Sequence, residues 1–116
     1  MTNEAAVSPL TLEVARDGDT AVVRCRGRLV VGVNQLLYVK ASELIPNHKR
    51  IVLDLTDLTF MDSTGLGTLV RVYVSAKSAG CSLELVNLGK RIRELLGIAN
   101  LLSVFTIVGE NNIRFH

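Results

Sequence analysis

The residues whose types could do chemistry stand together in one short stretch of the chain. It supplies one carboxylate, two hydroxyls, two glycines and a leucine: Asp62, Ser63, Thr64, Gly65, Leu66 and Gly67. The stretch follows a buried strand predicted at residues 51–55 and opens a helix predicted at residues 63–78. Ligand and partner sites in open α/β sheets lie beyond the carboxyl ends of strands, at junctions of this kind. We therefore predict that residues 62–67 form the functional site.

An enzymatic role for this stretch lacks the groups that it would need. A serine nucleophile requires a base, normally a histidine that a carboxylate orients. The chain has two histidines, His48 in a predicted loop and His116 at the end, and neither is expected beside Ser63. We therefore expect no catalytic residue, and an enzyme acting through Asp62 and Ser63 stays an alternative.

Nucleotide and metal motifs are incomplete as well. The two glycines begin a dinucleotide-binding pattern, but Val70 occupies its third glycine position, and the chain has no P-loop. Asp54, Asp57 and Asp62 lie within a short span, yet no histidine or cysteine accompanies them at ligand spacing. We interpret these aspartates as turn and cap carboxylates, and we expect no metal and no cofactor.

Helix capping explains part of the stretch, and a phosphorylation switch explains more of it. Asp62 or Ser63 at the N-cap accepts hydrogen bonds from first-turn amides, which stabilises a helix by about 1 kcal/mol. Gly65 and Gly67 each cost about 1 kcal/mol relative to alanine, yet they leave backbone amides uncovered for a partner surface or a phosphate. Phosphorylation adds about −1.5 to −2 charges, which the macrodipole favours at a helix start. The stretch therefore predicts binding that is regulated by charge.

Composition narrows the class of protein. The 116 residues suit one domain, and a content of 48% hydrophobic and 21% charged residues is typical of a globular protein. A formal charge of +2 and an aromatic content of 4% argue against direct nucleic-acid binding. No apolar run approaches the ~20 residues of a membrane span, and the start does not resemble a signal peptide. We expect a cytoplasmic protein without membrane insertion, in which Cys25 and Cys81 are reduced.

Hydrophobic periodicity predicts an α/β fold. Alternation at residues 10–14 and 21–27, around a turn at Gly18, predicts an antiparallel hairpin. Helices then alternate with strands, which predicts parallel pairing through right-handed crossovers. The expected helices are residues 33–44, 63–78 and 90–99, and the expected later strands are residues 51–55, 82–87 and 104–108. We predict a flexible lead at residues 1–9 and a single domain at residues 10–116, with a mostly parallel sheet of about five strands and about three helices.

Residues 60–67, behind the strand at residues 51–55, resemble the signature of bacterial anti-sigma-factor antagonists, the STAS domain. The likeness continues through residues 93–101 and covers about residues 10–108. It implies partner switching, in which an anti-sigma factor that is also a serine kinase phosphorylates Ser63, with Thr64 as the alternative position. The unphosphorylated protein binds that anti-sigma factor and releases a sigma factor, phosphorylation blocks binding, and a serine phosphatase resets the cycle. The resemblance also implies that Asp62 positions the hydroxyl and contacts the kinase.

One departure from the resemblance follows the second predicted strand. The family commonly has Gly-Glu-Leu-Asp there, whereas this chain has Arg28 and Val30 at the two acidic positions. The difference favours an alternative function, a scaffold or accessory subunit of a stress-signalling assembly or a lipid-transport complex. Both functions describe a binding module without catalytic machinery of its own.

Overall fold

The structure is a computed structural model that describes residues 9–108. Its elements, in chain order, are β1 (Leu10–Asp17), β2 (Thr20–Leu29), α1 (Asn34–Leu44), the 3-10 helix η2 (Ile45–Asn47), β3 (Arg50–Met61), α2 (Ser63–Ser78), β4 (Ser82–Val86), α3 (Lys90–Ile98) and β5 (Thr106–Val108). Residues 1–8 and 109–116 lie outside the described residues, so the predicted lead and the predicted end of the domain stay predictions.

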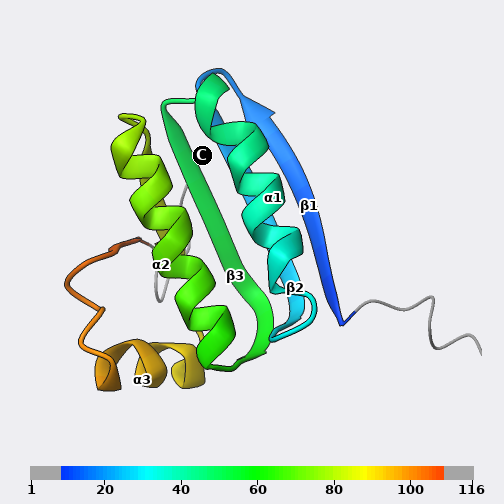
Figure 1. Ribbon diagram of the computed structural model, residues 1–116, viewed down its shortest axis with the longest axis vertical. Coiled ribbons are helices and arrows are strands. Elements are labelled where there is room, and N and C mark those ends of the chain that lie inside the picture. Colours follow the sequence, from blue (N-terminus) through cyan, green and yellow to red (C-terminus); the bar gives the residue numbers. More distant parts are fainter. Residues whose placement is uncertain (1–8, 109–116) are drawn as a thin grey trace, which may run out of the picture.

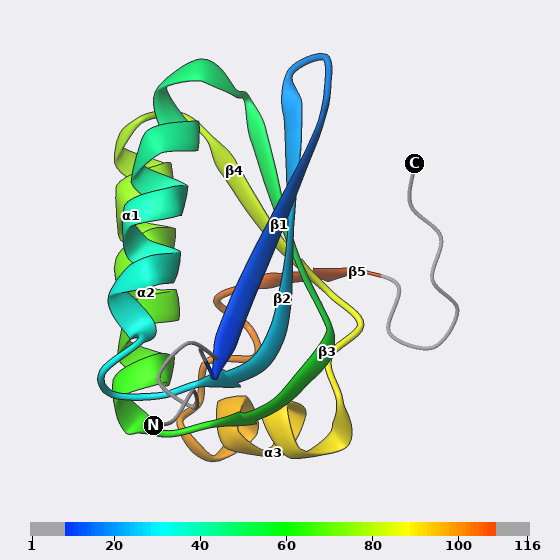
Figure 2. The same ribbon diagram turned by 90° about the vertical axis from the view of Figure 1, so that its right-hand side faces the viewer.

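The strands of the described chain form one five-stranded sheet in the order β1-β2-β3-β4-β5. β1 and β2 pair antiparallel, and all other neighbours pair parallel. Helices α1 and α2 lie side by side on one face of the sheet, and α3 lies at the end where β3 finishes (Figures 1 and 2). The predicted α/β class, the N-terminal hairpin and the mostly parallel sheet are confirmed.

β3 extends over 12 residues, whereas the sequence predicted a strand only at residues 51–55. Its register against β2 shifts by one residue at two places. The first shift lies between the pairs Arg24↔Asp54 and Arg26↔Asp57, and the second between the pairs Gly27↔Leu58 and Arg28↔Phe60. Each shift is a β-bulge that adds one residue to β3 and bends the strand, and the bend is visible in Figure 2. Leu55, Leu58 and Met61 are therefore buried at a spacing of three. The alternation that marks a strand is lost there, which is why the prediction stopped short.

The core lies between the sheet and helices α1 and α2. α1 buries Leu37, Ala41 and Leu44, which follow one another at helical spacing. The apolar spacing in the sequence also predicts Leu36 and Val39 on this stripe, which is wrong, because they are 47% and 53% exposed. α2 buries Gly65, Thr68, Leu69, Val72 and Ala76, and Leu66, Val70 and Tyr73 lie partly buried beside them. Because a fully buried leucine contributes about 1.5–3 kcal/mol, these faces hold both helices on the sheet.

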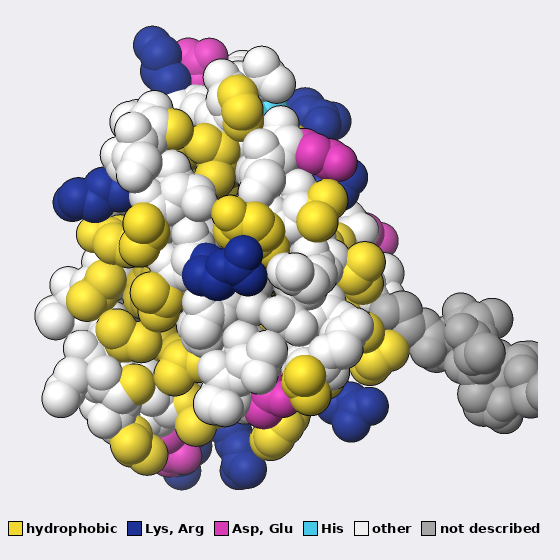
Figure 3. Space-filling view, viewed as in Figure 1, with side chains coloured by type: hydrophobic (Ala, Val, Ile, Leu, Met, Phe, Trp, Pro, Cys, Tyr) yellow, Lys and Arg dark blue, Asp and Glu magenta, His cyan; other side chains and the backbone are white. Residues whose placement is uncertain are grey.

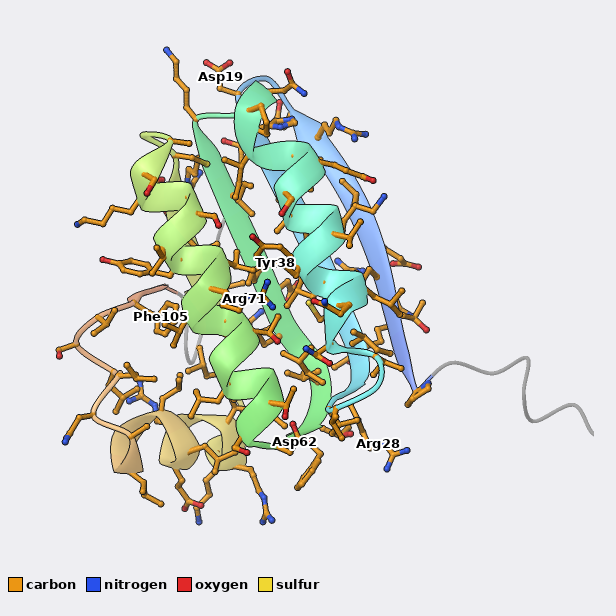
Figure 4. All side chains as sticks on the ribbon, viewed as in Figure 1. Asp19, Arg28, Tyr38, Asp62, Arg71 and Phe105 are labelled. Atoms are coloured by element: carbon orange, nitrogen blue, oxygen red, sulfur yellow. The ribbon has the colours of Figure 1, made fainter. Side chains whose placement is uncertain are left out.

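A stacked pair joins the outer surfaces of the two helices. The guanidinium carbon of Arg71 lies 4.0 Å from the centre of the Tyr38 ring, so α2 contacts α1 through a cation–π interaction (Figure 4). Arg71 also donates a long hydrogen bond of 3.5 Å to Gln35 Oε1. Arg71 is exposed, and its side chain links the two helices across their outer surfaces.

Both cysteines are free and buried. Cys25 lies in β2 and Cys81 precedes β4. Burial raises the pKa of both thiols, and the neighbouring Asp54 charge helps to raise that of Cys25 to about 12. They therefore pack as small apolar side chains, as the sequence predicted.

The opposite face of the sheet is built from ion pairs across neighbouring strands. Arg50 of β3 donates two hydrogen bonds to the Glu84 carboxylate of β4, at 2.7 and 2.8 Å. Arg26 of β2 contacts Glu13 of β1 at 3.2 Å and Asp57 of β3 at 3.8 Å. Opposite charges on adjacent strands favour this register.

Asp54 is the only charged side chain that is buried within residues 9–108, with 6% of its surface exposed. Its Oδ1 accepts hydrogen bonds from the Thr56 N–H at 3.0 Å, the Thr56 hydroxyl at 2.5 Å and Asn87 Nδ2 at 3.4 Å. Arg24 lies 3.6 Å from its other oxygen. Burial raises the pKa of this carboxyl, but the hydrogen bonds from Thr56 and Asn87, with the Arg24 charge, outweigh burial and lower it below 3.8.

Asp54→Asn should lower the free energy of unfolding by about 1–3 kcal/mol at pH 7, because an amide donor would then face Asn87 or Arg24. A carboxyl with a lowered pKa stabilises the fold above its unfolded pKa, and this contribution is lost as the pH falls through the folded pKa. Urea unfolding at pH 7 and below pH 4 should therefore show a smaller pH dependence in the variant. Asp57→Asn, an exposed position on the same strand, is the control and should change stability by less than about 1 kcal/mol. Equal effects of the two substitutions would contradict this role of Asp54.

Candidate functional site

The Asp62 carboxylate bridges two elements at the start of α2. Its Oδ1 accepts a hydrogen bond of 2.8 Å from the Gly65 N–H, and its Oδ2 accepts one of 3.0 Å from the Val31 N–H. The first bond is an N-cap, which satisfies an amide that the helix itself leaves without a partner. The second ties the β2–α1 loop to the helix start. Hydrogen bonds from Val31 and then from Gly65 lower the pKa of the Asp62 carboxyl below 3.8.

The backbone around Asp62 is held as firmly as its side chain. The Asp62 N–H donates to the Leu29 carbonyl at 3.3 Å, which continues the pairing of β2 and β3 to the end of the strands. The amides of Val33 and Asn34 donate to the Val30 carbonyl and turn the loop into α1. The loop that carries Val31 is therefore fixed at both of its ends.

Gly65 is buried because α2 begins very close to the end of β2. A Cβ atom at this position would lie 2.1 Å from the Leu29 carbonyl oxygen and 2.8 Å from Met61 Cγ. Its N–H is also bonded to Asp62, so the interpretation that Gly65 leaves an amide open to a partner was wrong. Gly67 differs, because it is exposed and a Cβ atom there would meet no atom within 4 Å. The two glycines therefore have separate roles.

Ser63 is the exposed first residue of α2, and its hydroxyl makes no hydrogen bond within the part of the chain that the structure describes. The neighbouring Asp62 cannot serve it as a strong base, since both of its oxygens already accept backbone N–H groups. His48 is bonded to the Leu44 carbonyl before the start of β3, whereas Ser63 follows the end of that strand. His116 lies outside the described residues. The structure therefore places no described histidine beside the Ser63 hydroxyl.

Thr64 is half-buried, and its position depends on a link between α1 and α2. The Thr68 hydroxyl donates to the Thr64 carbonyl at 2.9 Å and accepts from Asn34 Nδ2 at 3.0 Å. Sequence reasoning missed Asn34, Thr68 and Val31 as residues that shape the site. Thr68 could have been found, because a threonine among the apolar residues of a helix face indicates a buried hydroxyl. Val31 could not, because it contributes its backbone N–H, which every residue except proline has.

The three aspartates considered for metal binding have different partners. Asp54 bonds with Thr56 and Asn87, Asp57 pairs with Arg26, and Asp62 bridges two backbone amides. Within residues 9–108, no three side chains of histidine, cysteine, aspartate or glutamate are grouped so that they could hold a metal ion.

Apolar and basic side chains surround the start of α2. Val31 is 68% exposed and Phe60 is 37% exposed. Arg28 is exposed and stands opposite Phe60 in the register of β2 and β3, and the Arg91 guanidinium carbon lies 5.8 Å from the centre of the Phe60 ring. Figure 4 shows Arg28 and Asp62 at the same end of the molecule, far from Asp19.

A family model for the STAS domain matches residues 11–112. The chain belongs to the STAS domain family. Among its relatives, the anti-sigma-B factor antagonist of Bacillus subtilis is 30% identical over 98 residues, which are 84% of this chain and 90% of the relative. A STAS-domain containing protein of Pseudomonas aeruginosa is 26% identical over 98 residues, 84% of this chain and 97% of the relative.

A solved structure also shares the fold of this STAS domain. The anti-sigma factor antagonist SpoIIAA in its unphosphorylated form superposes with a TM-score of 0.72 at 22% identity, over 87% of this chain and 89% of that chain. No helix within residues 9–108 is both long enough and apolar enough to cross a membrane.

Alanine substitutions at the two glycines test their separate roles. We expect Gly65→Ala to lower the free energy of unfolding by about 1–3 kcal/mol or more, because its methyl group would overlap the Leu29 carbonyl. Gly67→Ala should leave stability unchanged or raise it by up to about 1 kcal/mol, since alanine is the better helix former. Urea unfolding of both variants measures the difference. Similar effects at the two positions would contradict the close approach of α2 to β2.

The Asp62 bridge also predicts a titration that NMR can follow. Because the folded carboxyl titrates below 3.8, both hydrogen bonds persist above that pH and are lost as the pH falls through the lowered pKa. The amide shifts of Val31 and Gly65 should change together, with one midpoint below pH 3.8, and should not titrate in Asp62→Asn. Asp57→Asn should leave the titration intact. Different midpoints for the two amides would show that they do not share one carboxylate.

Proposed function

We propose that this protein is an anti-sigma-factor antagonist that acts by partner switching, with Ser63 as its phosphorylation site. The unphosphorylated form binds an anti-sigma factor that is also a serine kinase, and a sigma factor is released. Phosphorylation of Ser63 blocks that binding, and a serine phosphatase restores it. The observation that carries the proposal is the exposed Ser63 hydroxyl at the start of α2, which makes no hydrogen bond within residues 9–108.

The geometry around Ser63 favours a phosphoryl transfer that is catalysed by a partner kinase. Phosphoryl transfer requires an accessible hydroxyl on the substrate protein, while the kinase provides the base, the metal ions and the positioning of the nucleotide. Ser63 offers such a hydroxyl, and Asp62 is already occupied by two backbone amides. This division of roles supports a binding protein without catalytic residues of its own.

The charge of the modification suits the position. A phosphate carries about −1.5 to −2 charges, and at the first residue of α2 it meets the positive end of the helix macrodipole. The fold therefore tolerates phosphorylation, and the consequence falls on the docked partner through repulsion and bulk. In this proposal the partner contacts residues 62–67, with Asp62 and Gly65 shaping the surface and Ser63, Thr64, Leu66 and Gly67 nearest to it.

The relatives support the general role. One is named an anti-sigma-B factor antagonist, and the SpoIIAA structure is described by its phosphorylation state. The proposal also makes the protein cytoplasmic, because sigma factors act on RNA polymerase there.

The alternative is a scaffold or accessory subunit of a stress-signalling assembly or a lipid-transport complex. It is favoured by Arg28 and Val30, which stand at positions that are commonly acidic in anti-sigma-factor antagonists. A pull-down with the full chain as bait separates the two functions. Recovery of scaffold or transporter subunits without an anti-sigma kinase would replace the proposed function by the alternative.

Incubation with the anti-sigma kinase of the same organism and ATP tests the modified residue. We expect mass spectrometry to find one phosphate on the wild-type protein and on Thr64→Ala, and none on Ser63→Ala, because Ser63 is exposed whereas Thr64 is half-buried. Equal labelling of the wild type and Ser63→Ala would reject Ser63 as the site. Labelling that disappears only in Thr64→Ala would move the site to Thr64.

A further inference from the structure

The start of α2 lies within a continuous surface of apolar and basic side chains, which we call the α2-start surface. It consists of Arg28, Val31, Phe60, Ser63 and Arg91. Arg28 and Phe60 are neighbours in the β2–β3 register, Arg91 stands over the Phe60 ring, and Val31 is tied to the residue before Ser63. At the lower end of Figure 3, hydrophobic side chains lie beside lysine and arginine side chains.

The arginines of this surface differ from those on the helix-free face of the sheet. On that face Arg24, Arg26 and Arg50 each contact at least one carboxylate. Within residues 9–108, Arg28 has no ion pair, and the Arg91 guanidinium contacts the Phe60 ring alone. Their charges are therefore available to an external partner.

The acids near this surface do not cancel that charge. Both oxygens of Asp62 accept backbone N–H bonds, and Asp57 contacts Arg26. Glu94 is exposed one turn further along α3 and forms no ion pair within the described chain. Lys90, at the start of α3, adds an exposed cation that has no ion pair with any other residue of the described range. Even with Asp62 and Glu94 counted as full negative charges, the three cations Arg28, Lys90 and Arg91 leave the region around the start of α2 with net positive charge.

The same surface offers apolar anchors. Val31 exposes 68% of its surface and Phe60 exposes 37%. Protein interfaces are enriched in aromatic residues and arginine, and arginine binds carboxylates through a bidentate fork. A single partner can therefore bury the apolar side chains and neutralise the arginines at the same time.

We propose that the partner of the α2-start surface is an acidic protein surface, which presents carboxylates to Arg28 and Arg91 and apolar side chains to Val31 and Phe60. The inference rests on the proposed function, in that the docked partner is the one that Ser63 phosphorylation excludes. It also explains why phosphorylation weakens binding: a phosphate on Ser63 brings negative charge against the partner's carboxylates and competes for the same guanidinium groups.

Charge-reversal variants test the partner's chemistry. Calorimetric titration of the unphosphorylated full chain with the anti-sigma kinase of the same organism compares the wild type with Arg28→Glu, Arg91→Glu and Arg16→Glu. Arg16 is a matched control, because it is exposed, has no ion pair within the described chain and lies in β1 near the hairpin turn at the opposite end. We expect Arg28→Glu and Arg91→Glu each to weaken binding about tenfold or more at low salt, with less effect at high salt. Arg16→Glu should bind as the wild type does.

The outcomes separate this inference from the proposed function. If the kinase binds the wild type, and Arg28→Glu and Arg91→Glu bind equally well or more tightly, the acidic partner is rejected while the proposed function stands.

If no anti-sigma factor binds the wild type, the proposed function fails, and an NMR titration with a capped peptide of alternating glutamate and leucine decides the inference. Amide shifts near Val31 and Phe60 that vanish in the double variant Arg28→Glu, Arg91→Glu support it. No shift in the wild type, or unchanged shifts in the double variant, overturns it, and unchanged thermal unfolding of the variants excludes misfolding.

Discussion

The single carboxylate of Asp62 accepts hydrogen bonds from two backbone amides of different elements, those of Val31 and Gly65, and the local structure of the candidate site depends on these two bonds. The bridge starts α2, fixes the loop before α1 and places the exposed Ser63 hydroxyl one residue later. It requires the start of α2 to approach the Leu29 carbonyl so closely that only glycine fits at position 65. The carboxylate is consequently a structural group, and in the proposed function a partner supplies the chemistry at Ser63.

The order of strands and helices, the hairpin and the start of α2 could all be predicted from hydrophobic periodicity and turn residues, because those signals are local. The full length of β3 could not, since two bulges replace its alternation by a spacing of three at Leu55, Leu58 and Met61. The packing role of Gly65 was also hidden, because it depends on Leu29, a residue far away in the sequence. Residue type alone predicted that residues 62–67 follow a strand and open a helix, and the structure confirms that placement. The packing and hydrogen bonds of the individual residues there depend on long-range contacts.

Charge is distributed unevenly over the two ends and faces of this STAS domain. On the helix-free face, arginines and carboxylates pair across neighbouring strands, so that face is neutralised within the fold. Around the start of α2, Asp62 is saturated by backbone amides, while Arg28 has no ion pair within the described chain. A sheet that neutralises its own charges on one face and leaves cations beside an exposed serine is well suited to binding that a phosphate can control.

The most direct test of partner switching compares two forms of one protein. The unphosphorylated chain and the chain carrying one phosphate on Ser63 are each titrated with the anti-sigma factor of the same organism, after their unfolding transitions have been shown to agree. We predict that the unphosphorylated form binds and that the phosphorylated form, although equally folded, binds at least about a hundredfold more weakly, a difference of about 2.7 kcal/mol. Equal affinity of the two folded forms would contradict control of binding by Ser63.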